Sequence, residues 1–240
     1  MTIAPCVPWA MTTRDNPDGA NGLEPAWLLH RRPFRNTSLI LDLFLPGGGR
    51  VGAVARGGRR NPALAPFVPL WVQLQRGSGE LHTLRQVEPR AAAVSLTGTA
   101  LYCGFYLNEL LVRLLHRDDP HPDLWPAYEY TLRELKGDTP LDVTLRRFEM
   151  VLLEEVGYGL VLEHDGEGQP LSPELRYGWV PDLGLIPNKN GHSGADLQAL
   201  AEDRWTPAVR RMAKQLLREA LAPHLGGRPL RSRELFRGTS

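Results

Sequence analysis

The sequence predicts an α+β protein in which a small N-terminal β-barrel is followed by a helical region. From residue 24 to residue 90 the apolar residues fall in short runs, several of them alternating with polar residues, and Pro- and Gly-rich turns separate the runs. After Pro89 the apolar spacing changes to the period of an amphipathic helix. With 240 residues the chain can bury a sizeable core, in one large domain or two small ones.

The clearest strand is the run TSLILDLFLP, in which the alternate leucines from Leu39 to Leu45 share one face. The run FVPLWVQLQ repeats this alternation from Val68 to Leu74. Five short runs in about 65 residues are what a small closed or partly open barrel requires, and the five-stranded OB-fold is the obvious candidate.

Four helices are expected after the barrel, and each begins at a residue that favours a helix N-terminus, either a capping hydroxyl or a proline. These starts are Thr97, Pro122, the pair Thr139 and Pro140, and the pair Thr206 and Pro207. The third helix is expected to stop at Gly157 and Gly159. Residues 160–192 are predicted to be a loop-rich insertion, because glycine and proline interrupt every run there.

The first 23 residues are predicted to be a disordered extension, since they are rich in Pro, Thr, Asn, Asp and Gly. They have neither the basic nor the continuous apolar region of a secretory signal. Only Cys6 and Cys103 occur, which argues against a disulfide framework and fits a reducing cytoplasm. No apolar run approaches the roughly 20 residues that a membrane span needs.

The net charge of +1 hides a segregation of charge along the chain. Residues 24–90 carry a net charge of +6, residues 91–203 a net charge of −11, and residues 204–240 a net charge of +7. Two basic blocks around an acidic one suggest a nucleic-acid surface assembled from both ends of the chain. The alternative is that the blocks neutralise each other by packing together.

Glycines and arginines crowd together in the stretch LPGGGRVGAVARGGRR, from Leu45 to Arg60. Its glycines match the G-x-G-x-x-G of a dinucleotide loop, but a strand-like run lies on each side where that loop needs a helix. The glycines are therefore interpreted as a hairpin turn. The arginines that follow indicate either a solvated loop or a barrel rim that follows a phosphate backbone.

The candidate DNA-binding residues are the cations of the two basic blocks. They are Arg31, Arg35, Arg50, Arg56, Arg59, Arg60, Arg210, Arg211, Lys214, Arg228, Arg231 and Arg233. Aromatic residues in the strands could stack bases, although aromatic residues in strands more often belong to the core. These residues are Trp27, Phe34, Phe44, Phe67 and Trp71.

Three stretches resemble catalytic or metal motifs, and the first two are interpreted as turns. HRDDPHPD, from His116 to Asp123, lacks every companion motif of a kinase and would need metal ligands to converge across a proline-broken turn. EHDGEG lacks partner ligands, and GHSGA lacks the final glycine and the preceding strand of a nucleophile elbow. No catalytic constellation remains, so neither enzymatic activity nor a cofactor is predicted.

The stretch LRRFE places two arginines next to apolar residues within the acidic block. Arg146 could pair with Glu149 three residues later on the same helix. Alternatively, Arg146 and Arg147 could form the basic edge of an apolar groove at Leu145 and Phe148, which would suit an acidic peptide with an apolar end.

Four stretches in order, between about Trp27 and Phe236, resemble the RecO family of bacterial recombination mediators. They are RPFRNTSLILDLFLPGGGRVGAVARGGRR, LYCGFYLNELLVRLL, LRRFEMVLLEEVGYG and LGGRPLRSRELF. The resemblance implies an OB-fold DNA-binding domain, here residues 24–90, and a helical domain, here residues 91–240.

The resemblance also implies a function in DNA repair and homologous recombination, inside the cell at the nucleoid. RecO proteins bind single- and double-stranded DNA, anneal complementary strands and, with RecR, help to load RecA onto DNA coated by single-strand-binding protein. They also recognise the acidic tail of single-strand-binding protein, for which Arg146 and Arg147 are the candidates here. Some members carry a four-cysteine zinc site after the third helix, where this sequence has no cysteine, so no metal is predicted.

Two other classes of function remain open. One is a Mg²⁺-dependent nucleic-acid-processing enzyme that uses the carboxylates between Asp118 and Asp123. The other is a protein-interaction adaptor whose basic surfaces bind acidic partners and have no affinity for DNA.

Overall fold

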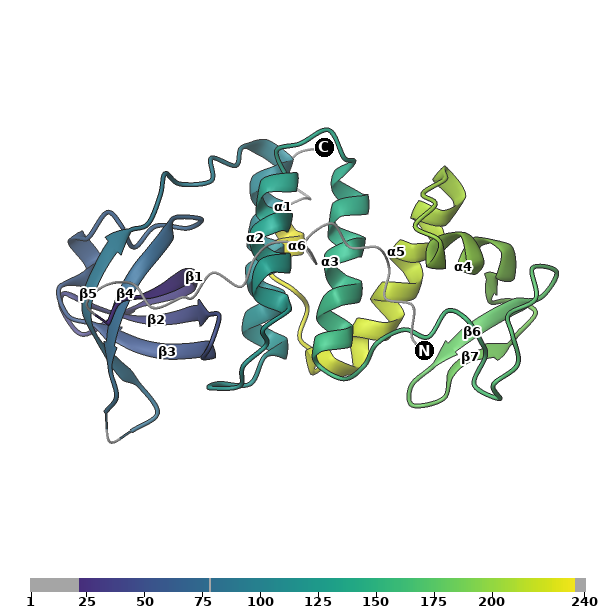
Figure 1. Cartoon of the computed structure of the whole chain (residues 1–240), viewed down its shortest axis with the longest axis horizontal. Helices are drawn as coiled ribbons and strands as arrows, with labels where there is room; N and C mark the ends of the chain where they lie inside the picture. Colours follow the sequence, from purple (N-terminus) through teal and green to yellow (C-terminus); the bar gives the residue numbers. More distant parts are fainter. Residues whose placement is uncertain (1–21, 78, 236–240) are drawn as a thin grey trace. The chain divides into compact units, whose positions relative to one another are not determined.

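The computed structural model describes residues 22–77 and 79–235 (Figure 1). Contacts divide the described chain into two compact units. The first, called here the barrel unit, holds the described residues up to Asp138 together with residues 230–235. The second, called the helix–sheet unit, holds residues 139–229. Apart from Gly22 and Leu23, the extension predicted to be disordered lies outside the described residues.

Five strands close into a barrel with the order β1-β2-β3-β5-β4, which confirms the predicted five-stranded barrel and the α+β class. The strands are β1 (Glu24–Phe34), β2 (Ser38–Leu45), β3 (Gly49–Ala55), β4 (Pro69–Gln75) and β5 (His82–Pro89). All neighbours are antiparallel except β3 and β5, which are parallel. The alternate leucines of β2 fill the barrel core together with Leu70 and Val72 of β4.

The glycine-rich stretch forms the β2–β3 hairpin, as predicted, with Leu45 paired to Gly49. Gly49 has a φ of +61°, in the left-handed region that favours glycine. A Cβ atom at this position would lie 1.8 Å from the backbone oxygen of Asp119. The hairpin therefore requires glycine here for its backbone conformation and for its close contact with the turn after α1 (Gly98–Leu114).

The barrel unit also contains α1, α2 (Leu124–Glu134) and the short α6 (Ser232–Leu235). Thr97 occupies the N-cap position of α1, as predicted. The carboxylate of Glu109 on α1 accepts hydrogen bonds from the backbone amides of Arg231 and Ser232, at 2.9 and 2.8 Å. The amides at a helix N-terminus have no hydrogen-bond partner within the helix, and Glu109 supplies one for the start of α6. The Glu109 carboxylate thereby attaches the α6 segment to α1.

The helix–sheet unit combines three helices with a small antiparallel sheet in the order β7-β6-β8. Its elements are α3 (Leu141–Glu155), β6 (Arg176–Val180), β7 (Gly184–Pro187), β8 (His192–Ser193), α4 (Gly194–Ala201) and α5 (Pro207–Leu221). Thr206 caps α5 as predicted, accepting a hydrogen bond from the backbone amide of Val209 at 3.2 Å. The helix α4 was not predicted.

Part of the region expected to be loop-rich therefore forms strands. Each strand spans only two to five residues, too few for an alternating pattern to be recognised. In the β6–β7 turn Asp182 has a φ of 64°, and Gly184, the first residue of β7, has a φ of 78°. No helix among the described residues has the length and apolar character of a membrane span.

Candidate nucleic-acid interface

Exposed arginines gather where the β1–β2 turn meets the segment after β3. They are Arg31, Arg32, Arg35, Arg56, Arg59 and Arg60, and we call them the arginine rim. The backbone amide of Arg59 donates to the carbonyl of Thr37 at 3.2 Å, and its guanidinium donates to the carbonyl of Arg35 at 2.8 Å. Arg31 donates to the carbonyl of Leu64. These bonds hold the two segments together.

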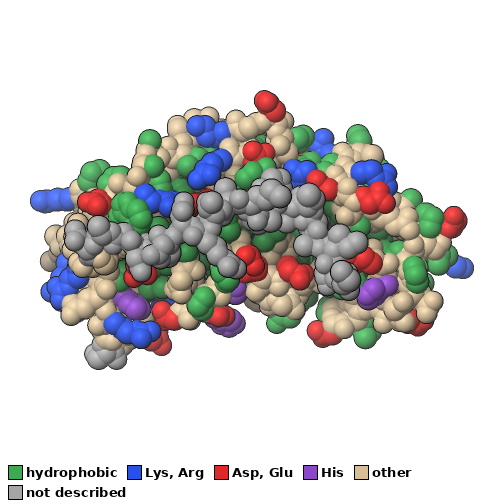
Figure 2. Space-filling view, viewed as in Figure 1, with side chains coloured by type: hydrophobic (Ala, Val, Ile, Leu, Met, Phe, Trp, Pro, Cys, Tyr) green, Lys and Arg blue, Asp and Glu red, His purple; other side chains and the backbone are tan. Residues whose placement is uncertain are grey.

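The arginine rim concentrates positive charge on the surface of the described barrel unit. Among the described residues, no carboxylate lies within ion-pair distance of any rim guanidinium. The only acidic residue between Arg31 and Leu64 is Asp42, which is buried. Basic side chains are visible in Figure 2 over the barrel strands of Figure 1. Such a cluster of exposed guanidinium groups is suited to contacts with phosphates.

The structure separates the five candidate aromatic platforms into two groups. Trp27, Phe44 and Phe67 are at most 3% exposed and pack against other aromatic rings of the barrel unit. Trp71 and Phe34 are partly exposed. Only Phe34 is next to a rim residue, since the guanidinium of Arg35 lies 5.1 Å from the centre of its ring. Phe34 is therefore the aromatic side chain that could stack a base beside the arginine rim.

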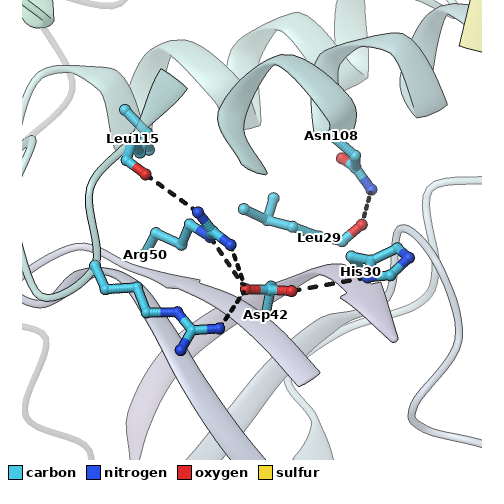
Figure 3. Close-up of polar contacts among 7 residues, drawn as sticks. Leu29, His30, Asp42, Arg50, Asn108 and Leu115 are labelled. Atoms are coloured by element: carbon cyan, nitrogen blue, oxygen red, sulfur yellow. Dashed lines mark hydrogen bonds and ion pairs between the residues drawn. The ribbon is translucent and has the colours of Figure 1, made fainter. Parts of the chain in front are cut away.

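Arg50, another candidate DNA contact, belongs to a largely buried ionic cluster (Figure 3). Its guanidinium donates to one carboxylate oxygen of Asp42 at 3.0 and 2.8 Å and to the carbonyl of Leu115 at 3.2 Å. The Arg117 guanidinium and the His30 Nδ1 each lie 3.7 Å from an oxygen of the same carboxylate. Arg50 thereby connects β3 to the residue that ends α1, and its guanidinium is engaged in contacts within the barrel unit.

The cluster perturbs the pKa of Asp42. Burial alone would raise this pKa, but the contacts with His30 and Arg50 and the charges of Arg50 and Arg117 lower it from 3.8 to about 2. A carboxyl group with a lower pKa in the folded state stabilises the fold above its unfolded pKa. That stability is lost as the pH falls through the folded pKa.

We therefore expect acid to remove about 2 kcal/mol of stability through Asp42, between about pH 4 and pH 2. The measurement is the free energy of unfolding of the wild type and of Asp42→Asn, by denaturant titration at several pH values. The difference between the two proteins should shrink across this range, since the amide does not titrate. A constant difference would contradict the assignment.

The candidate cations near the C-terminus have different environments. Arg210 donates to both carboxylate oxygens of Asp142, at 2.7 and 2.6 Å. Arg211, Lys214 and the unpredicted Arg218 are exposed on α5 with no carboxylate at ion-pair distance among the described residues. Their spacing of three and four residues places them on one helix face, and this spacing could have identified Arg218 from the sequence.

The remaining candidates lie after α5. Arg228, Arg231 and Arg233 are all exposed. Arg228 belongs to the helix–sheet unit, whereas Arg231 and Arg233 belong to the barrel unit. The C-terminal basic block of the sequence is thus divided between the two units.

The arginines of LRRFE are both engaged within the helix–sheet unit. Arg146 pairs with Glu149, whose side chain is 1% exposed, which confirms the predicted intrahelical pair. Arg147 donates to both carboxylate oxygens of Asp203, at 3.0 and 2.6 Å. Leu145 and Phe148 are 8% and 1% exposed and belong to the core. Of the four residues, Arg147 is the most accessible to an acidic partner.

Two of the carboxylates after α1 each lie near one histidine. Asp118 Oδ1 lies 3.5 Å from His82 Nε2, and Asp119 Oδ2 lies 3.8 Å from His121 Nε2. Among residues 22–77 and 79–235, no group of three or more His, Cys, Asp or Glu side chains could hold a metal ion.

Two family models together match most of the chain. The model for the N-terminal part of recombination protein O matches residues 23–93, and the model for its C-terminal part matches residues 95–189. The chain belongs to the RecO family. The boundary between the two matches lies close to the predicted end of the OB-fold domain, at residue 90.

Several bacterial relatives named DNA repair protein RecO cover nearly the whole chain. The relative from Stutzerimonas stutzeri is 47% identical over 220 residues, which is 89% of this chain and 92% of the relative. The relative from Halorhodospira halophila is 45% identical over 232 residues, or 92% and 98%. The relative from Methylococcus capsulatus is 45% identical over 228 residues, or 91% and 94%. Family membership supports a role in DNA repair.

Proposed function

We propose that this chain is a non-enzymatic mediator of recombinational DNA repair. In this proposal it binds single- and double-stranded DNA, anneals complementary strands and, with RecR, helps to load RecA onto DNA coated by single-strand-binding protein. The observation that carries the DNA-binding part is the arginine rim. Its six exposed guanidinium groups have no carboxylate partner among the described residues.

Annealing requires two polyanions to approach each other, so their repulsion must be screened. Cations that contact phosphates release the counterions condensed on the DNA, which favours binding most strongly at low salt. In the arginine rim the guanidiniums are available for such contacts, because no ion pair within the described part of the chain competes for them. Arg50 and Arg210, by contrast, are already paired with Asp42 and Asp142.

The experiment that tests the proposal is a fluorescence-anisotropy titration of labelled single-stranded DNA at several salt concentrations. The logarithm of the affinity should fall linearly with the logarithm of salt, with a slope of about −0.7 for each phosphate contact. Absence of DNA affinity would favour the adaptor function. Incubation of the DNA with Mg²⁺ is the companion assay, and cleavage would favour the nuclease function.

Recruitment to single-strand-binding protein is the part of the proposal that concerns LRRFE. An acidic tail needs cations for its carboxylates, and Arg147 is the cation of this stretch whose partner is also exposed. Its guanidinium lies 5.9 Å from the centre of the Trp205 ring, and the Trp205 indole, like Arg147, donates to Asp203. We propose that the Asp203 carboxylate occupies the position that a carboxylate of the tail would take.

Arg147→Ala is expected to weaken binding of a tail peptide about tenfold, the effect of losing one charge-assisted hydrogen bond. Asp203→Asn should instead strengthen binding, because the competing carboxylate becomes neutral. Both affinities can be measured by anisotropy with a labelled peptide, with DNA binding as the control that should stay close to wild type.

Arg146→Ala is the comparison variant in this series. It removes the partner of buried Glu149 and should lower stability more than Arg147→Ala does. Normal peptide binding by both arginine variants would place the tail site elsewhere.

A further inference from the structure

A groove runs along one side of α5 in the helix–sheet unit. Its first part, about 450 Å³, is lined by residues of β6, of the β7–β8 turn and of α5, among them Arg176, Trp179 and Arg211. Its second part, about 520 Å³, continues along α5 past Lys214 and Arg218. The two parts share Arg211, Gln215 and Glu219, so they form one continuous surface, called here the α5 groove.

Most of the charged side chains that line the α5 groove are basic, although its unit is acidic as a whole. Residues 139–229 carry a net charge of −3. Arg176, Arg211, Lys214 and Arg218 nevertheless line the groove, and each is exposed with no carboxylate at ion-pair distance in the described part of the chain. A local excess of unpaired cations indicates an anionic ligand.

The carboxylates of the groove do not cancel this excess. Glu219 is held by His192, whose Nε2 lies 3.1 Å from one carboxylate oxygen, and by Gln215, whose amide donates to the other at 3.0 Å. The second carboxylate is that of Asp196, in the first turn of α4. Four cations against two carboxylates leave a net charge of +2 in the groove.

The first part of the groove also contains an aromatic side chain and two amide side chains, which are suited to stacking on a base and to hydrogen bonding with its edge. The partly buried Trp179 packs against the core of the unit and lines the first part of the groove. The amide side chains of Asn188 and Asn190 line the same part. From Arg211 to Arg218 the helix rises about 10 Å, which is the length of about three stacked nucleotides at 3.4 Å each. A row of cations that ends at an aromatic ring is typical of single-strand binding sites.

We infer that the α5 groove binds a segment of single-stranded nucleic acid, separate from the strand on the arginine rim. Arg176, Arg211, Lys214 and Arg218 contact phosphates, and Trp179 stacks a base. The inference rests on the proposed annealing function, because it supplies the site for the second strand.

The test uses the full chain with Arg56, Arg59 and Arg60 replaced by alanine, so that binding at the rim is weakened. In this background, Arg211→Ala with Lys214→Ala and Arg218→Ala should lower the affinity for a labelled oligo-dT at least tenfold. The slope of log affinity against log salt should fall by about 2. Trp179→Ala should lower the affinity about tenfold, whereas Trp179→Phe should retain most of it.

Two controls separate a lost contact from a lost fold. Arg204→Ala removes an exposed cation of the same unit that pairs with Glu202 and does not line the groove, and it should leave the affinity unchanged. Arg211→Lys combined with Arg218→Lys keeps both charges and should retain most of the binding. Equal loss with lysine and with alanine would overturn the inference.

The remaining outcomes distinguish this inference from the proposed function. The groove is not a nucleic-acid site if its substitutions leave the affinity for oligo-dT unchanged both in the wild-type chain and in the chain with Arg56, Arg59 and Arg60 replaced by alanine. If they abolish only the binding of a hexaglutamate peptide, the groove is a peptide site and the inference is also overturned. If rim substitutions have no effect while groove substitutions abolish binding, the rim proposal fails and the inference stands.

Discussion

Arg56→Ala combined with Arg59→Ala and Arg60→Ala is expected to weaken single-stranded DNA binding about a hundredfold at about 0.1 M salt. Each lost phosphate contact should lower the slope of log affinity against log salt by about 0.7, so the slope should flatten by about 2. The fold should be unaffected, because all three side chains are exposed and none forms an ion pair among the described residues. Anisotropy titrations at four or more salt concentrations provide the measurement.

The control for this variant removes cations from another part of the barrel unit. Arg133→Ala with Lys136→Ala takes two exposed positive charges from the end of α2, where Arg133 lies 3.8 Å from Glu129. This variant should show only a small change in affinity and slope. Equal weakening by both variants would mean that net charge, rather than the rim, determines DNA affinity. An unchanged slope in the rim variant would mean that these arginines are merely solvated.

The barrel could be predicted because its core follows a short local pattern. Alternating leucines predict β2, and the β2–β3 hairpin follows from the glycines between two strand-like runs. The burial of Trp27 and Phe44 could not be read from this pattern, because helices of the same unit cover the face opposite the barrel core. Both rings pack against Tyr128 of α2. Alternation identifies one buried face of a strand but does not show when the other face is also covered.

Among the ion pairs of the candidate residues, the sequence predicted the one whose partners lie three residues apart. The pair of Arg146 with Glu149 follows from helical spacing. The pairs of Arg147 with Asp203 and of Arg210 with Asp142 span 56 and 68 residues. No spacing rule applies to residues so far apart in the sequence. The sequence therefore could not distinguish these paired arginines from those of the rim, which have no carboxylate partner among the described residues.

Arg50 is an intermediate case. Its partner Asp42 lies on the adjacent strand of the predicted hairpin, where Phe44 pairs with Arg50 and Asp42 pairs with Gly52. Arg50 and Asp42 are therefore diagonal neighbours, close enough for a long side chain to bridge. The register of the hairpin could have suggested this pair. Its connection to Leu115 depends on tertiary packing and could not have been predicted.

Arg50→Ala is expected to lower the free energy of unfolding by about 3 kcal/mol, at the lower end of the range for breaking a buried ion pair. The substitution removes both hydrogen bonds to Asp42, whose side chain is 9% exposed, and the bond to the Leu115 carbonyl. Denaturant titration at neutral pH measures the loss. Arg56→Ala, an exposed rim residue only six positions later, is the matched control and should change stability by less than about 0.5 kcal/mol.

Two further measurements separate a structural role of Arg50 from a role in DNA binding. Replacing both partners, with Asp42→Leu and Arg50→Met, should recover much of the lost stability, because a buried ion pair can often be exchanged for apolar side chains at little cost. The salt slope for single-stranded DNA should be unchanged in Arg50→Ala, measured at a temperature at which the variant is folded. A fall of about 0.7 in the slope with full stability would instead identify Arg50 as a phosphate contact, as the sequence alone had suggested.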